Sequence, residues 1–112
     1  MQNTQKIELK KLACKARMGA VEGTFHAKSG HPGGSLSAAD IMTYLYFNEM
    51  NVDPTNPKMK NRDRFVLSKG HCCPSLYAVL ALKGFFGWEE ISKLRHVGAM
   101  LQGHPDMNKT PG

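Results

Sequence analysis

Three of the five histidines in the 112-residue chain share one local setting. His31, His71 and His104 each follow a glycine, and each lies where a predicted helix or strand gives way to a loop. Glycine lets the backbone approach a ligand closely, and loops at strand ends are where open α/β sheets bind ligands. Because imidazole donates or accepts a hydrogen bond near neutral pH, it suits sugar hydroxyls, phosphate oxygens and proton transfer. These three residues are the candidate site, whereas His26 and His96 lack this setting and are interpreted as structural or solvated.

Other patterns for metal or phosphate binding are weak. His71, Cys72 and Cys73 are possible soft ligands, but adjacent cysteines cannot easily supply two corners of one tetrahedral site, and the sequence has no CxxC pattern. We expect Cys72 and Cys73 to enter a buried helix as small apolar side chains. Neither a GxGxxG nor a Walker-type loop occurs, and the glycine-rich segment 30–34 carries a proline. That segment therefore predicts a shaped, irregular turn rather than a dinucleotide loop.

Composition indicates one domain at most, with a thin core. Leu, Ile, Val and Phe together number 23 of 112 residues, close to the roughly 20% below which a highly charged chain is expected to be disordered. The three cysteines cannot all pair within one chain, the N-terminus has no apolar signal segment, and the longest apolar run, 76–82, is too short to span a bilayer. We therefore expect a cytoplasmic protein with free thiols and no membrane partner.

The formal net charge of +6 raises the question of nucleic-acid binding. The basic residues form two clusters, at 6–17 and at 58–69. A nucleic-acid surface would combine such charges with exposed aromatic residues or place them on one helix face. The first cluster has no aromatic residue near it, and Asp63 interrupts the second. We expect a solvated basic face and no nucleic-acid partner, although a basic surface also suits an anionic small molecule such as a phosphate ester.

Hydrophobic periodicity predicts four helices around the histidines, over residues 5–28, 37–50, 75–83 and 88–97. Within the first helix, one apolar stripe contains Cys14, Met18, Val21 and Phe25. A second, small-sided stripe predicts close packing against another element, and it contains Leu9, Ala13, Ala16 and Ala20. Gly84 is expected to end the third helix. Residues 51–64 are predicted to form a loop, and 98–112 an irregular tail.

A single strand is predicted at Phe65-Val66-Leu67, which is short, apolar and rich in β-favouring residues. A strand buried on both faces implies a parallel sheet with helices on either side. Because one strand is not a sheet, its backbone groups need neighbours that these residues do not supply. The expected fold class is therefore α/β, with residues 1–112 forming the incomplete and mostly helical first part of a larger domain.

Three motifs occur in an order and spacing that resemble one enzyme family. They are Ser29-Gly30-His31-Pro32-Gly33-Gly34-Ser35-Leu36, Asp63-Arg64-Phe65-Val66-Leu67-Ser68-Lys69-Gly70-His71 and Gln102-Gly103-His104-Pro105-Asp106. Together they closely resemble the start of transketolase, in the short form whose two halves are separate polypeptides. The resemblance covers about residue 10 to the end. It implies the opening helices and first strand of a Rossmann-like, parallel-sheet domain that binds thiamine diphosphate.

The resemblance also implies an activity and roles for the histidines. Transketolases use thiamine diphosphate and a divalent ion such as Mg²⁺, and they transfer a two-carbon ketol unit from a ketose phosphate to an aldose phosphate. By this resemblance, His71 is a catalytic residue on the diphosphate side of the cofactor and near the reacting centre. His31 and His104 are catalytic residues that bind the oxygens of the sugar phosphate substrate.

The rest of a transketolase site is expected outside these residues. The family's Gly-Asp-Gly metal motif and the glutamate that activates the cofactor have no counterpart in residues 1–112. The implied partners are therefore the C-terminal, pyrimidine-binding half and a second copy in the full enzyme. Lys69, Cys72 and Cys73 depart from the family pattern and receive no role. The alternative interpretation is a truncated, catalytically inactive chain that acts at most as an interaction segment.

Overall fold

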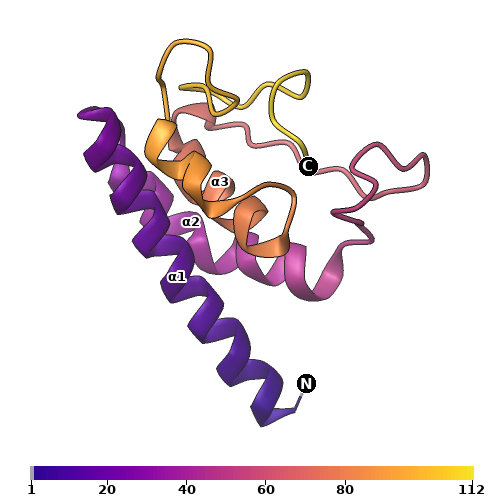
Figure 1. Ribbon diagram of the computed structural model, residues 1–112. Coiled ribbons are helices and arrows are strands. Elements are labelled where there is room, and N and C mark those ends of the chain that lie inside the picture. The colour runs from indigo at the N-terminus through magenta and orange to yellow at the C-terminus, as the bar shows by residue number, and fades with distance from the viewer. Residues whose placement is uncertain (1) are drawn as a thin grey trace.

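The structure, a computed structural model, describes residues 2–112 and is mostly helical over them. Its elements are α1 (Asn3–Ala27), α2 (Pro32–Tyr44), η1 (Leu45–Glu49), η2 (Gly70–Cys72), α3 (Cys73–Lys83) and η3 (Trp88–Lys93). Figure 1 shows α1 running along one side of the molecule, with α2 behind it, α3 near the centre and the yellow C-terminal segment looping over one end. None of the helices in this described part is long and apolar enough to cross a membrane.

Small residues form the buried face of α1. Ala13, Ala16 and Ala20 are at most 2% exposed, which confirms the close packing predicted for this stripe. At Gly19 the approach is closer still, because a Cβ there would lie 2.6 Å from the Cβ of Ala78 in α3 and 2.7 Å from the Trp88 ring. The helix therefore presents glycine and alanine to its neighbours so that the backbones can come together.

The larger apolar stripe of α1 lies on the opposite side and faces solvent. Met18, Val21 and Phe25 are 67%, 52% and 74% exposed, and Cys14 is also exposed. Helical spacing predicted that these residues share a face, but spacing alone does not say which face is buried. The buried face is the one that contains Gly19, because a larger side chain at that position would force the helices apart.

The second helix begins earlier than the sequence indicated. The prediction placed its start near Ser37 and an irregular turn at 30–34, yet α2 begins at Pro32 and includes both following glycines. Proline at the first position explains the early start, because its fixed φ suits a helix and no hydrogen bond is needed from its nitrogen. The helix continues past Tyr44 into the π-helical turn η1 and ends near the predicted Met50.

α3 is the most buried element of the molecule. Every residue from Cys73 to Leu80 is buried, as its predicted all-round apolar character required. Gly84 ends the helix at φ 106°, with its N–H directed at the carbonyls of Leu80 and Ala81, so the predicted stop is confirmed. The fourth predicted helix, 88–97, is wrong in extent: η3 ends at Lys93, and Arg95 then takes the left-handed backbone conformation at φ 64°.

The predicted strand at 65–67 is not formed among the described residues, so the sheet expected from it is not shown. A strand needs a neighbouring strand for its N–H and C=O groups, and none of the described segments offers one. Val66 is 83% exposed, whereas Phe65 and Leu67 pack partly against the core. Exposed and partly buried side chains therefore alternate over 65–67 as in a strand, although no ladder of backbone hydrogen bonds is formed there.

The connecting segment 51–64 is a loop, as predicted, and it is held closed by its own backbone. The N–H of Asn51 donates to a carboxylate oxygen of Asp63 at 2.6 Å, and the N–H of Asp63 donates back to the carbonyl of Asn51 at 2.8 Å. Residues 98–112 are also irregular, which agrees with the predicted tail.

Candidate functional site

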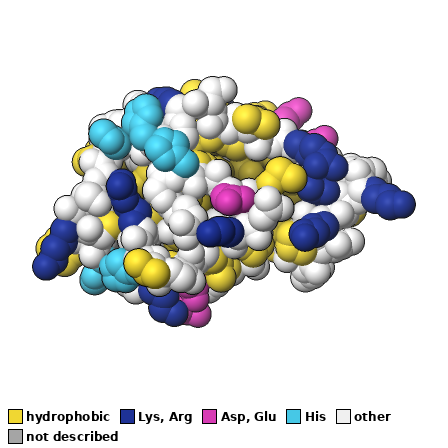
Figure 2. Space-filling view, turned by 90° about the horizontal axis from the view of Figure 1, so that it is seen from above, with side chains coloured by type: hydrophobic (Ala, Val, Ile, Leu, Met, Phe, Trp, Pro, Cys, Tyr) yellow, Lys and Arg dark blue, Asp and Glu magenta, His cyan; other side chains and the backbone are white. Residues whose placement is uncertain are grey.

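The three predicted histidines, which come from three separate segments, lie together. The rings of His31 and His71 are in contact, with centroids 4.9 Å apart and planes at 80°. The His104 ring lies against Gly70, because a Cβ built on that glycine would be 2.6 Å from its Cδ2. Figure 2 shows a group of histidine side chains at one edge of the face it displays, with a further histidine patch apart from it and lysine and arginine side chains spread over the same face. The Gly-His pattern therefore identified residues that the fold brings into one group.

Two contacts between α2 and η2 set the separation of His31 and His71. The buried hydroxyl of Ser35 donates to the carbonyl of Cys72 at 3.0 Å, across 37 residues of sequence. Gly34 faces the side chain of Cys72 so closely that a Cβ on the glycine would overlap the sulfur. Because His31 immediately precedes α2 and His71 lies in η2, this junction holds the two imidazoles side by side.

The site is open and polar. His31, His71 and His104 are all exposed, so their ring nitrogens are accessible to a ligand. Lys69 is exposed beside them, and its ammonium lies 3.4 Å from the hydroxyl of Ser37. Imidazoles that share one face with a flexible cation can donate hydrogen bonds to anionic or hydroxyl oxygens.

Metal ligation is not supported by this arrangement. Among residues 2–112, no group of three or more His, Cys, Asp and Glu side chains is placed to hold a metal ion. Cys72 and Cys73 are each 1% exposed and enter the core as small side chains, as the sequence indicated.

The remaining histidines have other surroundings. His26 packs edge-on against the ring of Phe25 at 5.4 Å on the outer part of α1. His96 lines a wide, open hollow together with Arg95 and Lys109. These contacts of His26 and His96 do not include any of the three clustered histidines.

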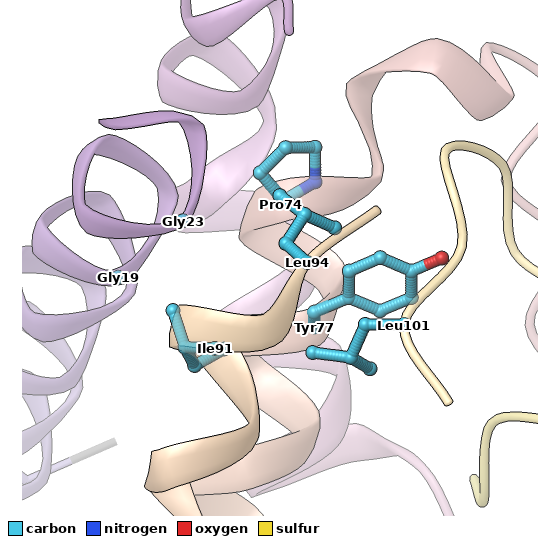
Figure 3. A pocket seen from close by; sticks show the side chains of 7 residues that line it. All are labelled: Gly19, Gly23, Pro74, Tyr77, Ile91, Leu94 and Leu101. Carbon is cyan, nitrogen blue, oxygen red and sulfur yellow. The ribbon is translucent and has the colours of Figure 1, made fainter. Parts of the chain in front are cut away.

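A narrow apolar seam runs between α1, α3 and the segment that follows η3 (Figure 3). It is lined by Gly19, Gly23, Pro74, Tyr77, Ile91, Leu94 and Leu101. The seam has no space for a water molecule and carries no charged side chain, so it is a packing contact rather than a ligand site. In Figure 3 the hydroxyl of Tyr77 points out of the seam toward the yellow segment of residues near 101.

The three thiols are free, and they differ sharply in access. Cys14 is exposed, whereas Cys72 and Cys73 are buried. We expect alkylation of freshly purified, folded protein to add one adduct quickly and to add all three only after denaturation, as followed by intact mass. A stable intramolecular disulfide, or rapid modification of all three thiols in the folded protein, would contradict this expectation.

Comparisons with known proteins point to one family. The sequence model of the transketolase, thiamine diphosphate binding domain family matches residues 9–112. The chain is 46% identical over 108 residues to the 6-deoxy-6-sulfo-D-fructose transketolase subunit SqwG of Clostridium sp. (strain MSTE9), covering 96% of this chain and 39% of that protein. It is 47% identical over 98 residues to one of the apulose-4-phosphate transketolase subunits of Phocaeicola vulgatus, covering 88% of this chain and 34% of that protein.

Solved structures give the same result. The transketolase from Leishmania mexicana superposes with a TM-score of 0.87 at 33% identity, over 93% of this chain and 16% of that one. The transketolase from Campylobacter jejuni superposes with a TM-score of 0.84 at 34% identity, over 92% of this chain and 16% of that one. The chain thus spans well under half the length of the relatives it matches. On this evidence the chain belongs to the transketolase family, within its thiamine diphosphate-binding domain.

Proposed function

We propose that these residues supply the histidine side of a transketolase active site, which transfers a two-carbon ketol unit from a ketose phosphate to an aldose phosphate. The observation that carries the proposal is the contact between the imidazoles of His31 and His71, with His104 against Gly70 beside them. All three lie inside the region that the family model matches. Their exposure leaves them free to meet a cofactor and a substrate.

Each histidine then has a distinct task. His71 donates to the diphosphate side of thiamine diphosphate and reaches toward the reacting centre, while His31 and His104 bind the hydroxyl and carbonyl oxygens of the sugar. The bound cofactor supplies carbanion stabilisation, and the protein supplies orientation and hydrogen bonds. Negative charge that develops on a substrate oxygen is stabilised by donors already in place. A hydrogen bond of this charge-assisted kind contributes roughly 1.5–3 kcal/mol.

The described residues fit part of the cofactor's surroundings and not its metal. Exposed imidazole N–H groups and the close backbone approach at Gly70 suit an anionic diphosphate. For Mg²⁺, which takes carboxylate, carbonyl and water oxygens, residues 2–112 offer no ligand cluster. We therefore propose that the metal ligands lie outside residues 2–112, and no step here depends on them.

The complete site is proposed to need further polypeptide. Two relatives are named as transketolase subunits, and this chain covers 39% and 34% of them. We place the remainder of the α/β domain, a separate pyrimidine-binding half and a second copy of the assembly around the histidine group, in the cytoplasm. Within that complete domain, residues 65–67 would gain the neighbouring strands that they lack here.

The experiment that tests this function compares residues 1–112 with the same residues joined to the rest of the thiamine diphosphate-binding half and mixed with the pyrimidine-binding half. Calorimetric titration with thiamine diphosphate and Mg²⁺ is expected to give no measurable binding for residues 1–112 alone. Binding and ketol transfer are expected once both additions are made. An assembled protein that neither binds the cofactor nor transfers ketol units would overturn the proposal and favour the inactive interaction segment, for which the exposed Met18, Val21 and Phe25 offer a surface.

A further inference from the structure

The geometry assigns Tyr77 and Cys73 a role as positioning residues, which hold the Gln102–Gly103 backbone so that His104 stays beside His71. This inference rests on the proposed function of His104 in binding substrate. It concerns two α3 residues whose side-chain hydrogen bonds go to the backbone before His104 and, on the proposed function, not to the substrate. Their influence would pass through the peptide groups that precede His104.

Two side-chain donors on one face of α3 meet the backbone just before His104. The hydroxyl of Tyr77 donates to the carbonyl of Gln102 at 2.5 Å, across 25 residues of sequence. The thiol of Cys73 donates to the carbonyl of Gly103 at 3.2 Å and lies 3.6 Å from that of Gln102. Because Cys73 and Tyr77 are four residues apart in a helix, both donors project in the same direction. Figure 3 shows the Tyr77 hydroxyl directed at this segment.

Both donors keep their protons. Burial raises the pKa of the Tyr77 hydroxyl well above its ordinary value and also raises the pKa of the Cys73 thiol. A buried hydroxyl or thiol in its neutral form is a donor, and the two carbonyls are its acceptors. Cys73 and Tyr77 are each 1% exposed, so both donor groups are shielded from water.

The same helix also sets the position of His71. Cys73 is the first residue of α3, and η2, which contains His71, leads directly into it. α3 is thus connected to one histidine through the chain and to the other through two hydrogen bonds. His104 is exposed apart from the contact of its ring with Gly70, so its location also depends on the backbone that carries it.

Other contacts close the loop behind Gln102 but do not reach His104. The side-chain amide of Gln102 donates to the carbonyl of Ala99 at 2.5 Å, and the hydroxyl of Thr110 donates to the carbonyl of Met100 at 2.6 Å. The N–H of Arg95 donates to the carbonyl of Leu101 at 2.8 Å. Residues 95–102 are therefore fixed locally, and the Tyr77 and Cys73 bonds extend that fixation to the residue before His104.

The test uses the assembled enzyme and five variants: Tyr77→Phe, Cys73→Ala, Cys73→Ser, His104→Ala and the double variant Tyr77→Phe/His104→Ala. Tyr77→Phe is expected to lower kcat/KM for the sugar phosphate about ten-fold, with affinity for thiamine diphosphate unchanged. Cys73→Ala should act in the same direction with a smaller effect, and Cys73→Ser, which restores a donor, should recover most of the loss. In the double variant, Tyr77→Phe should add almost nothing to the effect of His104→Ala, because the two changes disable one function.

A matched control separates positioning from loss of stability. Trp88→Phe also deletes a side-chain donor, since the indole N–H of Trp88 donates to Glu22 at 3.0 Å on the α1 side of the molecule. It is expected to leave kcat/KM unchanged even where it lowers the melting temperature as much as Tyr77→Phe does.

Two results would overturn the inference, and they are distinguishable from failure of the proposed function. One is a ten-fold loss from Tyr77→Phe that persists in full in the His104→Ala background, which indicates a general structural effect. The other is kinetics like those of the unsubstituted enzyme for Tyr77→Phe and Cys73→Ala while His104→Ala is impaired. If His104→Ala itself leaves catalysis unchanged, the substrate-binding role proposed for His104 fails.

Discussion

Replacement of His71 by alanine in the assembled enzyme is expected to weaken use of thiamine diphosphate and to lower kcat together, because this imidazole faces both the diphosphate and the reacting centre in the proposed site. His31→Ala and His104→Ala are expected to act mainly on the sugar steps. Loss of one placed donor should lower kcat/KM by about ten- to a few hundred-fold. Steady-state kinetics at varied cofactor and at varied sugar phosphate separate the two kinds of effect.

The chain contains its own control for these substitutions. His26 is an exposed histidine that packs on Phe25 in α1, so His26→Ala removes an imidazole without touching the cluster. It should leave the kinetic constants unchanged. Values like those of the unsubstituted enzyme for His31→Ala, His71→Ala and His104→Ala alike would contradict the assignment of all three residues.

Helix ends and buried faces of this fold could be predicted where local chemistry decides them. Gly84 stops α3 because only a residue without a Cβ adopts φ 106° at little cost, and the sequence shows that glycine. The alanine stripe of α1 indicated close packing because small side chains permit it. The prediction of a turn at Pro32 was wrong, because proline in a glycine-rich segment is typical both of a turn and of the first position of a helix.

Features that depend on contacts between distant segments could not be predicted from the sequence. The residues at 65–67 have the composition of a strand, yet a ladder is a property of two segments and not of one. Similarly, the exposed stripe of Met18, Val21 and Phe25 has the spacing of a buried face. Its exposure follows from Gly19, whose contact with Ala78 and Trp88 is made across the fold.

The candidate site also has a part that the sequence predicts and a part that it does not. His31, His71 and His104 could be selected as candidates because each carries a local signal, a glycine immediately before it. The residues that hold them carry no such signal. Ser35 reaches Cys72 across 37 residues, and Tyr77 reaches Gln102 across 25, so only the folded chain reveals these contacts.

Substitution of Gly34 by alanine is expected to disturb both the stability and the site of this protein. The new Cβ would overlap the sulfur of Cys72 and lie 3.2 Å from its Cβ, in a region that is already closely packed. Forcing a methyl group into such a contact costs about 1–3 kcal/mol, and in a domain of 150–250 residues each kcal/mol lowers the melting temperature by about 2–4 °C. Because Cys72 is buried, we expect α2 to move against η2, so that His31 and His71 separate and kcat/KM falls.

The sulfur of Cys72 offers a way to separate this steric effect from a general intolerance of change at the start of α2. In the double variant Gly34→Ala/Cys72→Ala the overlapping atom is gone, so both the melting temperature and kcat/KM should recover most of what Gly34→Ala alone removes. Gly33→Ala is the matched control, because a Cβ at that neighbouring glycine would meet nothing within 4 Å. Equal losses for Gly33→Ala and Gly34→Ala, or a double variant no better than Gly34→Ala, would show that the contact with Cys72 does not set the spacing of the two histidines.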